Sequence, residues 1–132
     1  MSNFIYDKAA GSLWKAEIDW ELDDTKVVLL RGHTPDKVNH QFLSDIPTGE
    51  RVAITPSLAN AIVNGRAIDA DDPVFSAVPA GPDCEAIALF IDTGTPATSR
   101  LVAYADTATG LPATPNGTDI TVIFNVAGIA TL

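Results

Sequence analysis

The stretch Cys84–Asp106, CEAIALFIDTGTPATSRLVAYAD, decides the fold of this chain. It holds two apolar runs, Ala86–Ile91 and Leu101–Ala105, which are joined by a loop rich in Thr, Gly, Pro and Ser. Both runs are short, contain β-branched or aromatic residues and end at turn residues, which favours strands over helices. Because both faces of the first run are apolar, we predict that this pair of strands lies at the centre of a sheet covered on both sides.

The N-terminal segment predicts a helix followed by a hairpin. The helix is expected to begin at Asn3, which would cap it, and to run through Ala16. Its apolar stripe consists of Tyr6, Ala9, Ala10, Leu13 and Trp14. Acidic and apolar residues then alternate from Glu17 to Leu22, which predicts a strand with one acidic face. Thr25–Arg31 is the expected return strand of that hairpin.

Short elements are expected along the rest of the chain. We predict a short helix at Asn39–Ile46 and brief strands at Arg51–Thr55, Ser57–Val63, Arg66–Asp69 and Val74–Val78, although Ser57–Val63 also suits a helix. Asn64-Gly65 is a strong signal for a hairpin turn. Asp119–Val126 alternates strictly and predicts a half-buried strand, with Ile129–Leu132 paired to it. The chain is therefore predicted to be mainly β, with residues 1–132 forming a single-domain β-sandwich or flattened barrel with a short N-terminal helix.

Length and composition are those of an ordinary globular domain. The chain has 132 residues, of which 46% are hydrophobic and 19% charged. No apolar run approaches the roughly 20 residues that a membrane span needs, and the first residues lack the pattern of a signal peptide. The single cysteine, Cys84, excludes an intramolecular disulfide and is interpreted as a half-buried small hydrophobic residue.

Charge is unevenly distributed along the chain. The net charge of −9 argues against nucleic-acid binding, which needs a basic surface. Up to Arg66 there are nine acidic and seven basic residues, whereas from Ala67 onward there are eight acidic residues and only Arg100. The second half therefore presents an almost purely acidic surface. Two readings stay open, a solubilising face and a contact surface for a basic partner.

The sharpest candidate for chemistry is Asp92-Thr93-Gly94, which follows the apolar end of the first central run. The triplet resembles the Asp-Thr-Gly of aspartic proteases, in which two aspartates share one proton and activate water. A chain this short would have to dimerise to supply two such residues. The following residues, Thr95-Pro96-Ala97-Thr98, depart from the family pattern, and Asp and Gly are common where a strand turns. We therefore interpret Asp92 as a turn residue and keep a small dimeric aspartic protease as an alternative.

Other constellations are weaker. His33 and His40 are seven residues apart with no cysteine nearby, so a zinc site is not expected. The run Asp69–Asp72 lacks the spacing of a calcium-binding loop and is interpreted as a solvated acidic turn. Trp14 and Trp20 lie on apolar stripes, which favours core packing, with one of them available for an interface. We predict no catalytic residues, no metal site and no cofactor.

Read as a whole, the chain resembles a known family. The opening NFIYDKAAGSLWKAEIDWELDDTKVVLL and the distal ALFIDTGTPATSRLVAYADTATGLPATPNGTDITVIFN are similar to small structural proteins of tailed bacteriophages. The similarity is densest from Ala86 to Asn125, and the middle, His33 to Asn64, is shorter than in many relatives. It lies in the overall pattern and brings no catalytic residues.

The resemblance implies a protein of the virion, assembled in the bacterial host cytoplasm. Several members of that family decorate or cement the capsid shell, so the expected partner is the major capsid protein, together with further copies of the chain as a dimer or trimer. A tail- or baseplate-associated protein is the alternative. No nucleic acid or membrane partner is expected. The residues proposed for contacts with partners are Phe4, Tyr6, Trp14, Trp20 and Arg100.

Overall fold

A five-stranded antiparallel sheet forms the middle of the structure. The computed structural model describes residues 3–124 and 128–131. Along the sheet the strands are β1 (Asn3–Ile5), β8 (Leu101–Ala105), β7 (Ala86–Ile91), β2 (Thr25–Leu30) and β3 (Arg51–Ile54). Every residue of β7 and β8 is buried, and β7 lies at the centre of the sheet. The prediction of a central pair buried on both faces is confirmed.

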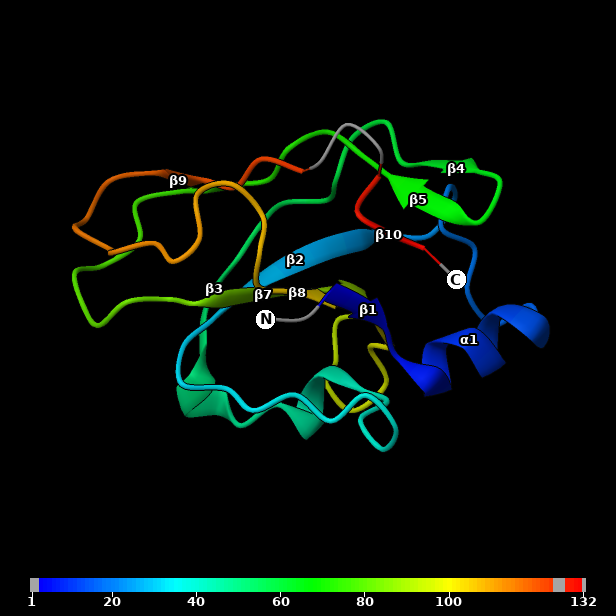
Figure 1. Ribbon diagram of the computed structural model, residues 1–132. Helices are drawn as coiled ribbons and strands as arrows, with labels where there is room; N and C mark the ends of the chain where they lie inside the picture. Colours follow the sequence, from blue (N-terminus) through cyan, green and yellow to red (C-terminus); the bar gives the residue numbers. More distant parts are fainter. Residues whose placement is uncertain (1–2, 125–127, 132) are drawn as a thin grey trace.

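Two smaller antiparallel sheets lie on one side of the main sheet. One contains β10 (Ala130–Thr131), β5 (Ala67–Asp69) and β4 (Ile62–Asn64); the other pairs β6 (Val74–Phe75) with β9 (Ile120–Thr121). Figure 1 shows these sheets above the main sheet, with α1 (Asp7–Trp14) and the segment of residues 32–50 below it. Cover on both sides explains why β7 is apolar on both faces. The predicted hairpin forms, but its turn lies one residue later than predicted: Asn64 pairs with Ala67, so the turn consists of Gly65, with φ of 63°, and Arg66.

The N-terminal helix is shorter than predicted. Residues Asn3–Ile5 pair with β8 as an edge strand, so the helix begins at Asp7. The side chain of Asn3 fastens that strand, since its amide donates to Thr107 Oγ1 at 2.6 Å and its Oδ1 accepts from the Asp106 N–H at 3.1 Å. A cap at Asn3 was therefore the wrong reading. These hydrogen bonds place its side chain at the sheet edge.

The predicted strand at residues 17–22 was wrong. Asp19 folds this segment into a turn, because its carboxylate accepts from the N–H groups of Glu21 and Leu22 at 3.2 Å. Ile18 and Trp20, two of the apolar residues in the alternating pattern, are still buried although the segment is not a strand. β2 pairs instead with β7, from Thr25↔Ile91 to Leu30↔Ala86.

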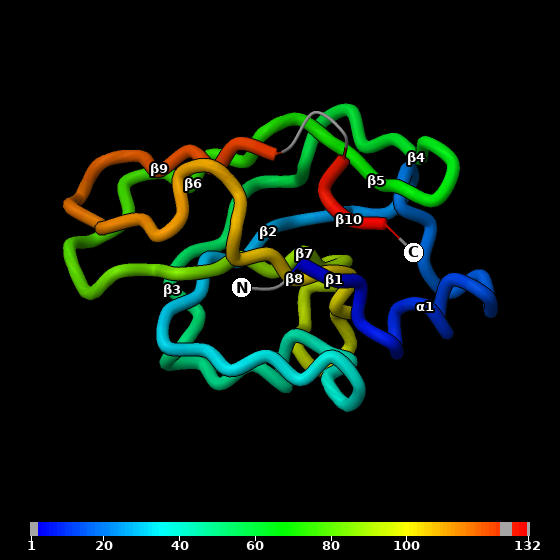
Figure 2. Tube along the Cα trace, in the orientation of Figure 1, coloured from blue at the N-terminus to red at the C-terminus, as the bar shows by residue number. Residues whose placement is uncertain are grey.

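The C-terminal pairing also differs from the prediction. The strand expected at residues 119–126 is reduced to β9, because the Phe124 N–H donates to Asp72 Oδ1 at 2.9 Å. Residues 125–127 and 132 lie outside the described part of the chain. β10 pairs with β5, not with β9, and Ile129 N–H donates to Ile68 O at 2.7 Å. As a result β1 and β10, near the two ends of the chain, lie side by side (Figure 2).

Shorter elements complete the fold. In place of the helix predicted at residues 39–46 there is a 3₁₀ turn, η1 (Leu43–Asp45), and a second one, η2 (Thr48–Glu50), precedes β3. Only the end of the strand predicted at residues 57–63 forms, as β4, and β6 is shorter than the predicted 74–78. The described chain is thus mainly strands in antiparallel sheets with one short α-helix. Among its helices there is none with the length and apolar character that crossing a membrane demands.

Candidate functional site

Asp92 holds the turn that follows β7. Its Oδ2 accepts a hydrogen bond from Lys26 Nζ at 2.6 Å, and its Oδ1 accepts from the Gly94 N–H at 2.9 Å. The bond from Lys26 and then the bond from Gly94 lower the pKa of the Asp92 carboxyl below its usual value. The same bond to Asp92 raises the pKa of Lys26. Both carboxylate oxygens therefore serve the local turn, in agreement with the interpretation of Asp92 as a turn residue.

The two histidines come together below the main sheet. Their rings stack with 5.7 Å between centroids, and His33 Nδ1 lies 2.6 Å from Glu50 Oε1. The backbone N–H of His33 donates to Glu85 Oε1 at 3.0 Å. Within residues 3–124 and 128–131, no three His, Cys, Asp or Glu side chains are grouped to hold a metal ion. The pair is therefore a packed polar contact that closes the loop after β2.

Two tyrosines extend this buried polar cluster. Tyr104 lies 6.3 Å from His33 between ring centroids, and Phe4 stacks on Tyr104 and meets Tyr6 edge-on. Burial, together with the charges of Asp106 and Glu85, raises the pKa of Tyr104 to about 12. Burial also raises the pKa of Tyr6, with a further contribution from Tyr104. Both phenols therefore stay protonated at neutral pH, as suits their packing in the interior.

Aspartates of the acidic run at residues 69–72 accept hydrogen bonds from nearby groups. Asp69 Oδ1 accepts from the Ala70 N–H and Asp71 Oδ2 from the Asn60 side chain, each within 2.9 Å. Cys84 is fully buried, deeper than predicted, and burial raises the pKa of its thiol. The two aspartates therefore stabilise local structure.

The five residues predicted to contact partners lie in different environments. Tyr6 and Trp20 are buried within the chain, Phe4 is half-buried, and Arg100 is half-buried and paired with Glu17 at 3.3 Å. Trp14 is 91% exposed. Core packing, favoured for both tryptophans, holds for Trp20 but not for Trp14, because α1 buries the face that carries Ala9 and Ser12; the alternative, an interface role for one of them, stays a prediction for Trp14. As contact residues the five stay predictions.

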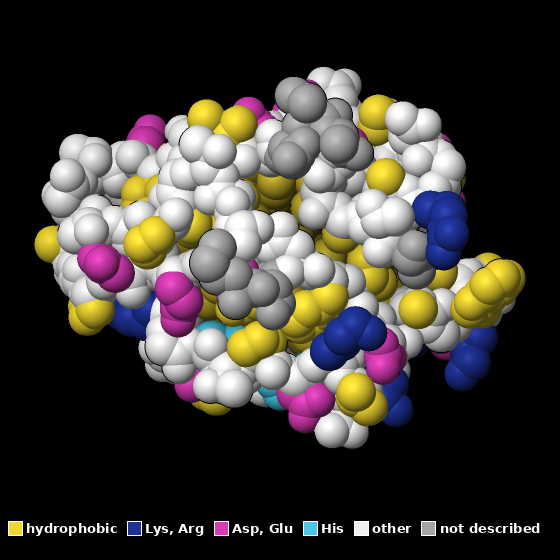
Figure 3. Space-filling model, viewed as in Figure 1, with side chains coloured by type: hydrophobic (Ala, Val, Ile, Leu, Met, Phe, Trp, Pro, Cys, Tyr) yellow, Lys and Arg dark blue, Asp and Glu magenta, His cyan; other side chains and the backbone are white. Residues whose placement is uncertain are grey.

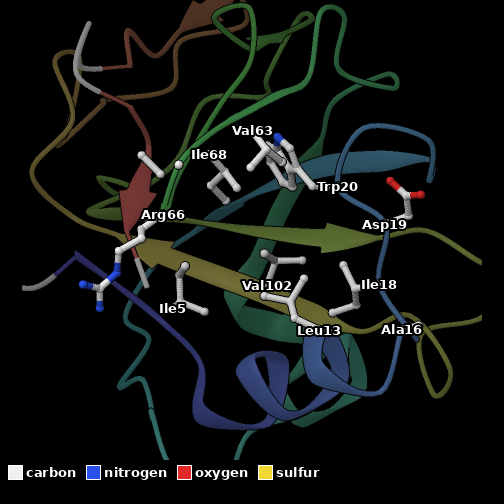
Figure 4. Close-up of a pocket in the computed structure, with 12 residues that line it drawn as sticks. Ile5, Leu13, Ala16, Ile18, Asp19, Trp20, Val63, Arg66, Ile68 and Val102 are labelled. Atoms are coloured by element: carbon white, nitrogen blue, oxygen red, sulfur yellow. The ribbon is translucent and has the colours of Figure 1, made fainter.

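An apolar hollow in the described surface is lined by Leu13, the residue before Trp14. It has a volume of about 370 Å³ and is framed by three parts of the chain: residues 13–20, the β4–β5 hairpin, and the strands β1 and β8 (Figure 4). The residues that line it are mostly apolar: Ile5, Leu13, Ala16, Ile18, Asp19, Trp20, Val63, Gly65, Arg66, Ala67, Ile68 and Val102. In Figure 3 yellow side chains fill the floor of this hollow, and dark blue ones stand beside it. It is a concave apolar surface with few polar groups, as binding sites are.

Two hydrogen bonds fix the wall of the hollow. The indole Nε1 of Trp20 donates to Asp69 O at 3.1 Å, and Glu21 Oε2 accepts from the Val63 N–H at 2.9 Å. Both bonds tie residues 19–22 to the β4–β5 hairpin. Because Glu21 occupies part of the free edge of β4, it also limits the access of a further strand there.

The end of α1 places Trp14 outside the core. Ala16 lies in the left-handed region, with φ of 58°, and the Glu17 N–H donates to Ser12 O at 2.8 Å. With the Ala16 N–H bonded to Leu13 O, this is the Schellman ending of a helix, in which glycine is the usual residue at the left-handed position. The chain then reverses toward the β4–β5 hairpin and leaves Trp14, on the last helical turn, exposed to solvent.

Sequence reasoning identified Trp14 and Trp20 but missed the hollow. Its lining comes from residues 5–20, 63–68 and 102, which are more than 30 residues apart in the sequence, and no local pattern connects Leu13 with Val63 or Val102. The Asn64-Gly65 turn was the one signal that pointed to a hairpin at this place.

Comparison with known proteins gives no family for this chain. No protein-family model matches it, and a search of curated proteins finds no significant match.

Proposed function

We propose that this protein is a structural component of a bacteriophage virion, a capsid decoration or cement protein that binds and stabilises the shell formed by the major capsid protein. The proposal rests on the pattern of the opening and distal segments described above and on one structural observation. That observation is the set of acidic side chains that the second half of the chain holds in place on its loops.

Three of these carboxylates are fixed by hydrogen bonds to neighbouring loops. Asp72 accepts from the Phe124 N–H at 2.9 Å, Asp119 from the Ala77 N–H at 2.8 Å, and Asp83 from Thr114 Oγ1 at 2.6 Å. All three residues are exposed. Charges that are already held in place lose little conformational freedom when they meet a partner, so they favour association with a basic surface.

The rest of the fold suits a protein present in many copies on a shell. The main sheet is covered on both sides and its central strands are fully buried, which makes a rigid unit. The polar clusters of the described residues are engaged in turns and packing, and this supports a binding role over an enzymatic one. We also propose the finer architecture, a β-sandwich whose layers are the main sheet and the two smaller sheets. An experimental structure with the smaller sheets away from the main sheet would contradict it.

The direct test uses expanded capsids that lack the protein. Incubation with purified protein should add regular density to the shell and raise the temperature at which the capsids break, because a ligand specific for the assembled shell stabilises it by mass action. Binding should weaken as salt rises, since part of the affinity is electrostatic. Asp72, Asp83 and Asp119 each accept a hydrogen bond that an Asn side chain can also accept. Their Asn variants should therefore keep the fold, and the loss of negative charge should weaken shell binding at low salt.

Imaging of the virion and a peptide-cleavage assay separate the alternatives. Density confined to the tail of the virion would favour a tail- or baseplate-associated protein. Peptide cleavage that is lost in Asp92→Asn would favour the dimeric aspartic protease. Absence of density on the shell, with normal folding of the protein, would contradict the decoration role.

A further inference from the structure

We propose that the protein forms a twofold homodimer in which Trp14 of each copy enters the apolar hollow of the other. This inference does not depend on binding to a shell, because it uses a different face of the molecule. Its basis is that Trp14 is an exposed aromatic side chain and that the residue before it on the helix lines an apolar hollow. Leu13, the residue before Trp14, lines the hollow.

The hollow suits a bulky apolar side chain. Its volume of about 370 Å³ is within the roughly 300–1,000 Å³ range of ligand pockets. Trp14 is 91% exposed in the single chain, so entry into a pocket would remove most of an indole from water. Aromatic side chains bury about 150–250 Å² each and dominate the energetics of interfaces.

Further exposed apolar side chains lie on or next to the segments that frame the hollow. Leu22 is 84% exposed, and Ile62 and Val63 are each 50% exposed. They lie on two segments that are held together, because Glu21 Oε2 accepts from the Val63 N–H. An exposed apolar surface of this kind, framed by polar residues, marks a place of protein contact.

Charge argues for a second copy as the occupant. The chain carries a net charge of −9, so two copies repel each other over most of their surface. The charged residues that line the hollow are Asp19 and Arg66, one of each sign. Lys15 follows Trp14 directly, and the nearby Glu17 is neutralised by its ion pair with Arg100. This face therefore offers charges of both signs, so that Arg66 or Lys15 of one copy can approach Asp19 of the other.

The position of the two features favours a closed dimer. When a projection and its receptor lie on one face, a twofold axis brings each projection to the other receptor, and both contacts form at once. Both are held by rigid elements, since Trp14 ends α1 and the hollow is fixed by the bond from Trp20 Nε1 to Asp69 O. Such preorganisation lowers the entropy lost on association.

Sedimentation velocity over a range of concentrations tests the proposal on the full chain. The wild type should sediment as a dimer, and Trp14→Ala should weaken dimerisation by at least roughly thirtyfold, as expected for the loss of an interface hot spot. Ile54→Ala is the matched control, because Ile54 is also exposed but lies on β3, at the opposite edge of the main sheet from β1. It should leave the dimer unchanged.

A mixing experiment tests the reciprocal exchange. Val63→Glu places a charge at the mouth of the hollow while Trp14 is intact, whereas Trp14→Ala keeps the hollow open. Each variant alone should be monomeric where the wild type is dimeric. A mixture should associate, because Trp14 of the first variant can enter the open hollow of the second. Equal melting temperatures of the two dilute variants and the wild type confirm that both fold.

Tryptophan fluorescence supplies an independent signal. The difference between the spectra of the wild type and Trp14→Phe isolates Trp14, since Trp20 is already 97% shielded within its own chain. Its emission should shift to shorter wavelength as the concentration passes through the dimerisation range.

Three results would overturn the proposal. They are a wild type that stays monomeric up to millimolar concentration, a dimer that persists in Trp14→Ala, and a Trp14-dependent trimer or larger ring. A Trp14 emission that shifts on addition of a small apolar compound to a monomeric wild type would identify the hollow as a ligand site instead.

Discussion

Lys26 and Asp92 join two neighbouring strands of the main sheet, β2 and β7, through an ion pair of 2.6 Å. Lys26 lies near the start of β2, and Asp92 follows the last residue of β7. Because these strands are antiparallel neighbours, the pair fastens one end of their ladder and at the same time holds the turn toward Gly94.

Asp92→Asn should lower the free energy of unfolding by about 0.5–2 kcal/mol, because it weakens hydrogen bonds to a charged group. The pKa of the Asp92 carboxyl is lowered in the folded state, so its contribution is present above the unfolded value and is lost as the pH falls through the folded value. Urea unfolding at neutral and acidic pH should show a difference between wild type and variant that shrinks on acidification. Lys26→Gln removes the same ion pair, so the difference in stability between the wild type and this variant should also shrink on acidification. An equal difference at both pH values would contradict this role.

Trp14 and Trp20 should respond oppositely to truncation. Trp14→Ala should change the stability of the dilute monomer by no more than about 0.5 kcal/mol, because the side chain is exposed. Trp20→Ala should cost about 3–5 kcal/mol, since it leaves a cavity and removes the hydrogen bond from the indole to Asp69 O. Denaturant unfolding at low protein concentration measures both. Similar losses in the two variants would show that Trp14 packs within its own chain.

Ala16→Gly should raise the free energy of unfolding by about 1 kcal/mol. Ala16 has φ of 58°, a conformation that costs an L-residue energy and that glycine adopts freely. The matched control is Ala10→Gly within α1, which should lower stability by a similar amount through its poor helix propensity. Thermal unfolding of the two variants shows whether each substitution raises or lowers stability. A loss of stability in Ala16→Gly would exclude the left-handed helix ending.

Alkaline pH should destabilise the fold through its buried tyrosines. The pKa of Tyr104 is raised to about 12 from an ordinary value of 10. Its contribution is complete below pH 10 and is lost between pH 10 and about 12, because over that range the unfolded chain releases the proton and the folded chain keeps it. Tyr104→Phe should flatten the fall in stability over this range, as followed by urea unfolding. An unchanged slope would show that the phenol ionises freely in the folded state.

Tyr6→Phe provides a companion to that experiment. The Tyr6 hydroxyl has no hydrogen-bond partner within the described part of the chain. Its removal should therefore leave stability at neutral pH unchanged or slightly higher. A large loss at neutral pH would show that the hydroxyl is bonded to a buried water.

The segment from Asp92 to Gly94 and the run of residues 17–22 show how far local patterns reach. Asp and Gly after an apolar strand predicted a turn, and the turn is there because both carboxylate oxygens bond locally. The alternation at residues 17–22 predicted a strand, yet Asp19 bonds to the N–H groups of its own turn. A period of two reports which residues are buried, and it does not report where their backbone hydrogen bonds go.

The sequence by itself determined the centre of this protein. Runs that are apolar on both faces are stable only under cover, so Ala86–Ile91 and Leu101–Ala105 could be assigned to a buried pair of strands without any knowledge of their partners. The hairpin signalled by Asn64-Gly65 followed in the same way, since the residues of a tight turn specify its backbone locally, although the turn itself consists of Gly65 and Arg66.

Only the tertiary structure decided the neighbours of those strands and the surface around Trp14. The pairing of β2 with β7 and of β10 with β5 depends on competition between distant segments for the same backbone groups. The exposure of Trp14 depends on which face of α1 meets β8, and the hollow beside it exists because residues 13–20 and the β4–β5 hairpin converge. These outcomes are set by long-range packing free energy, which no short window of sequence contains.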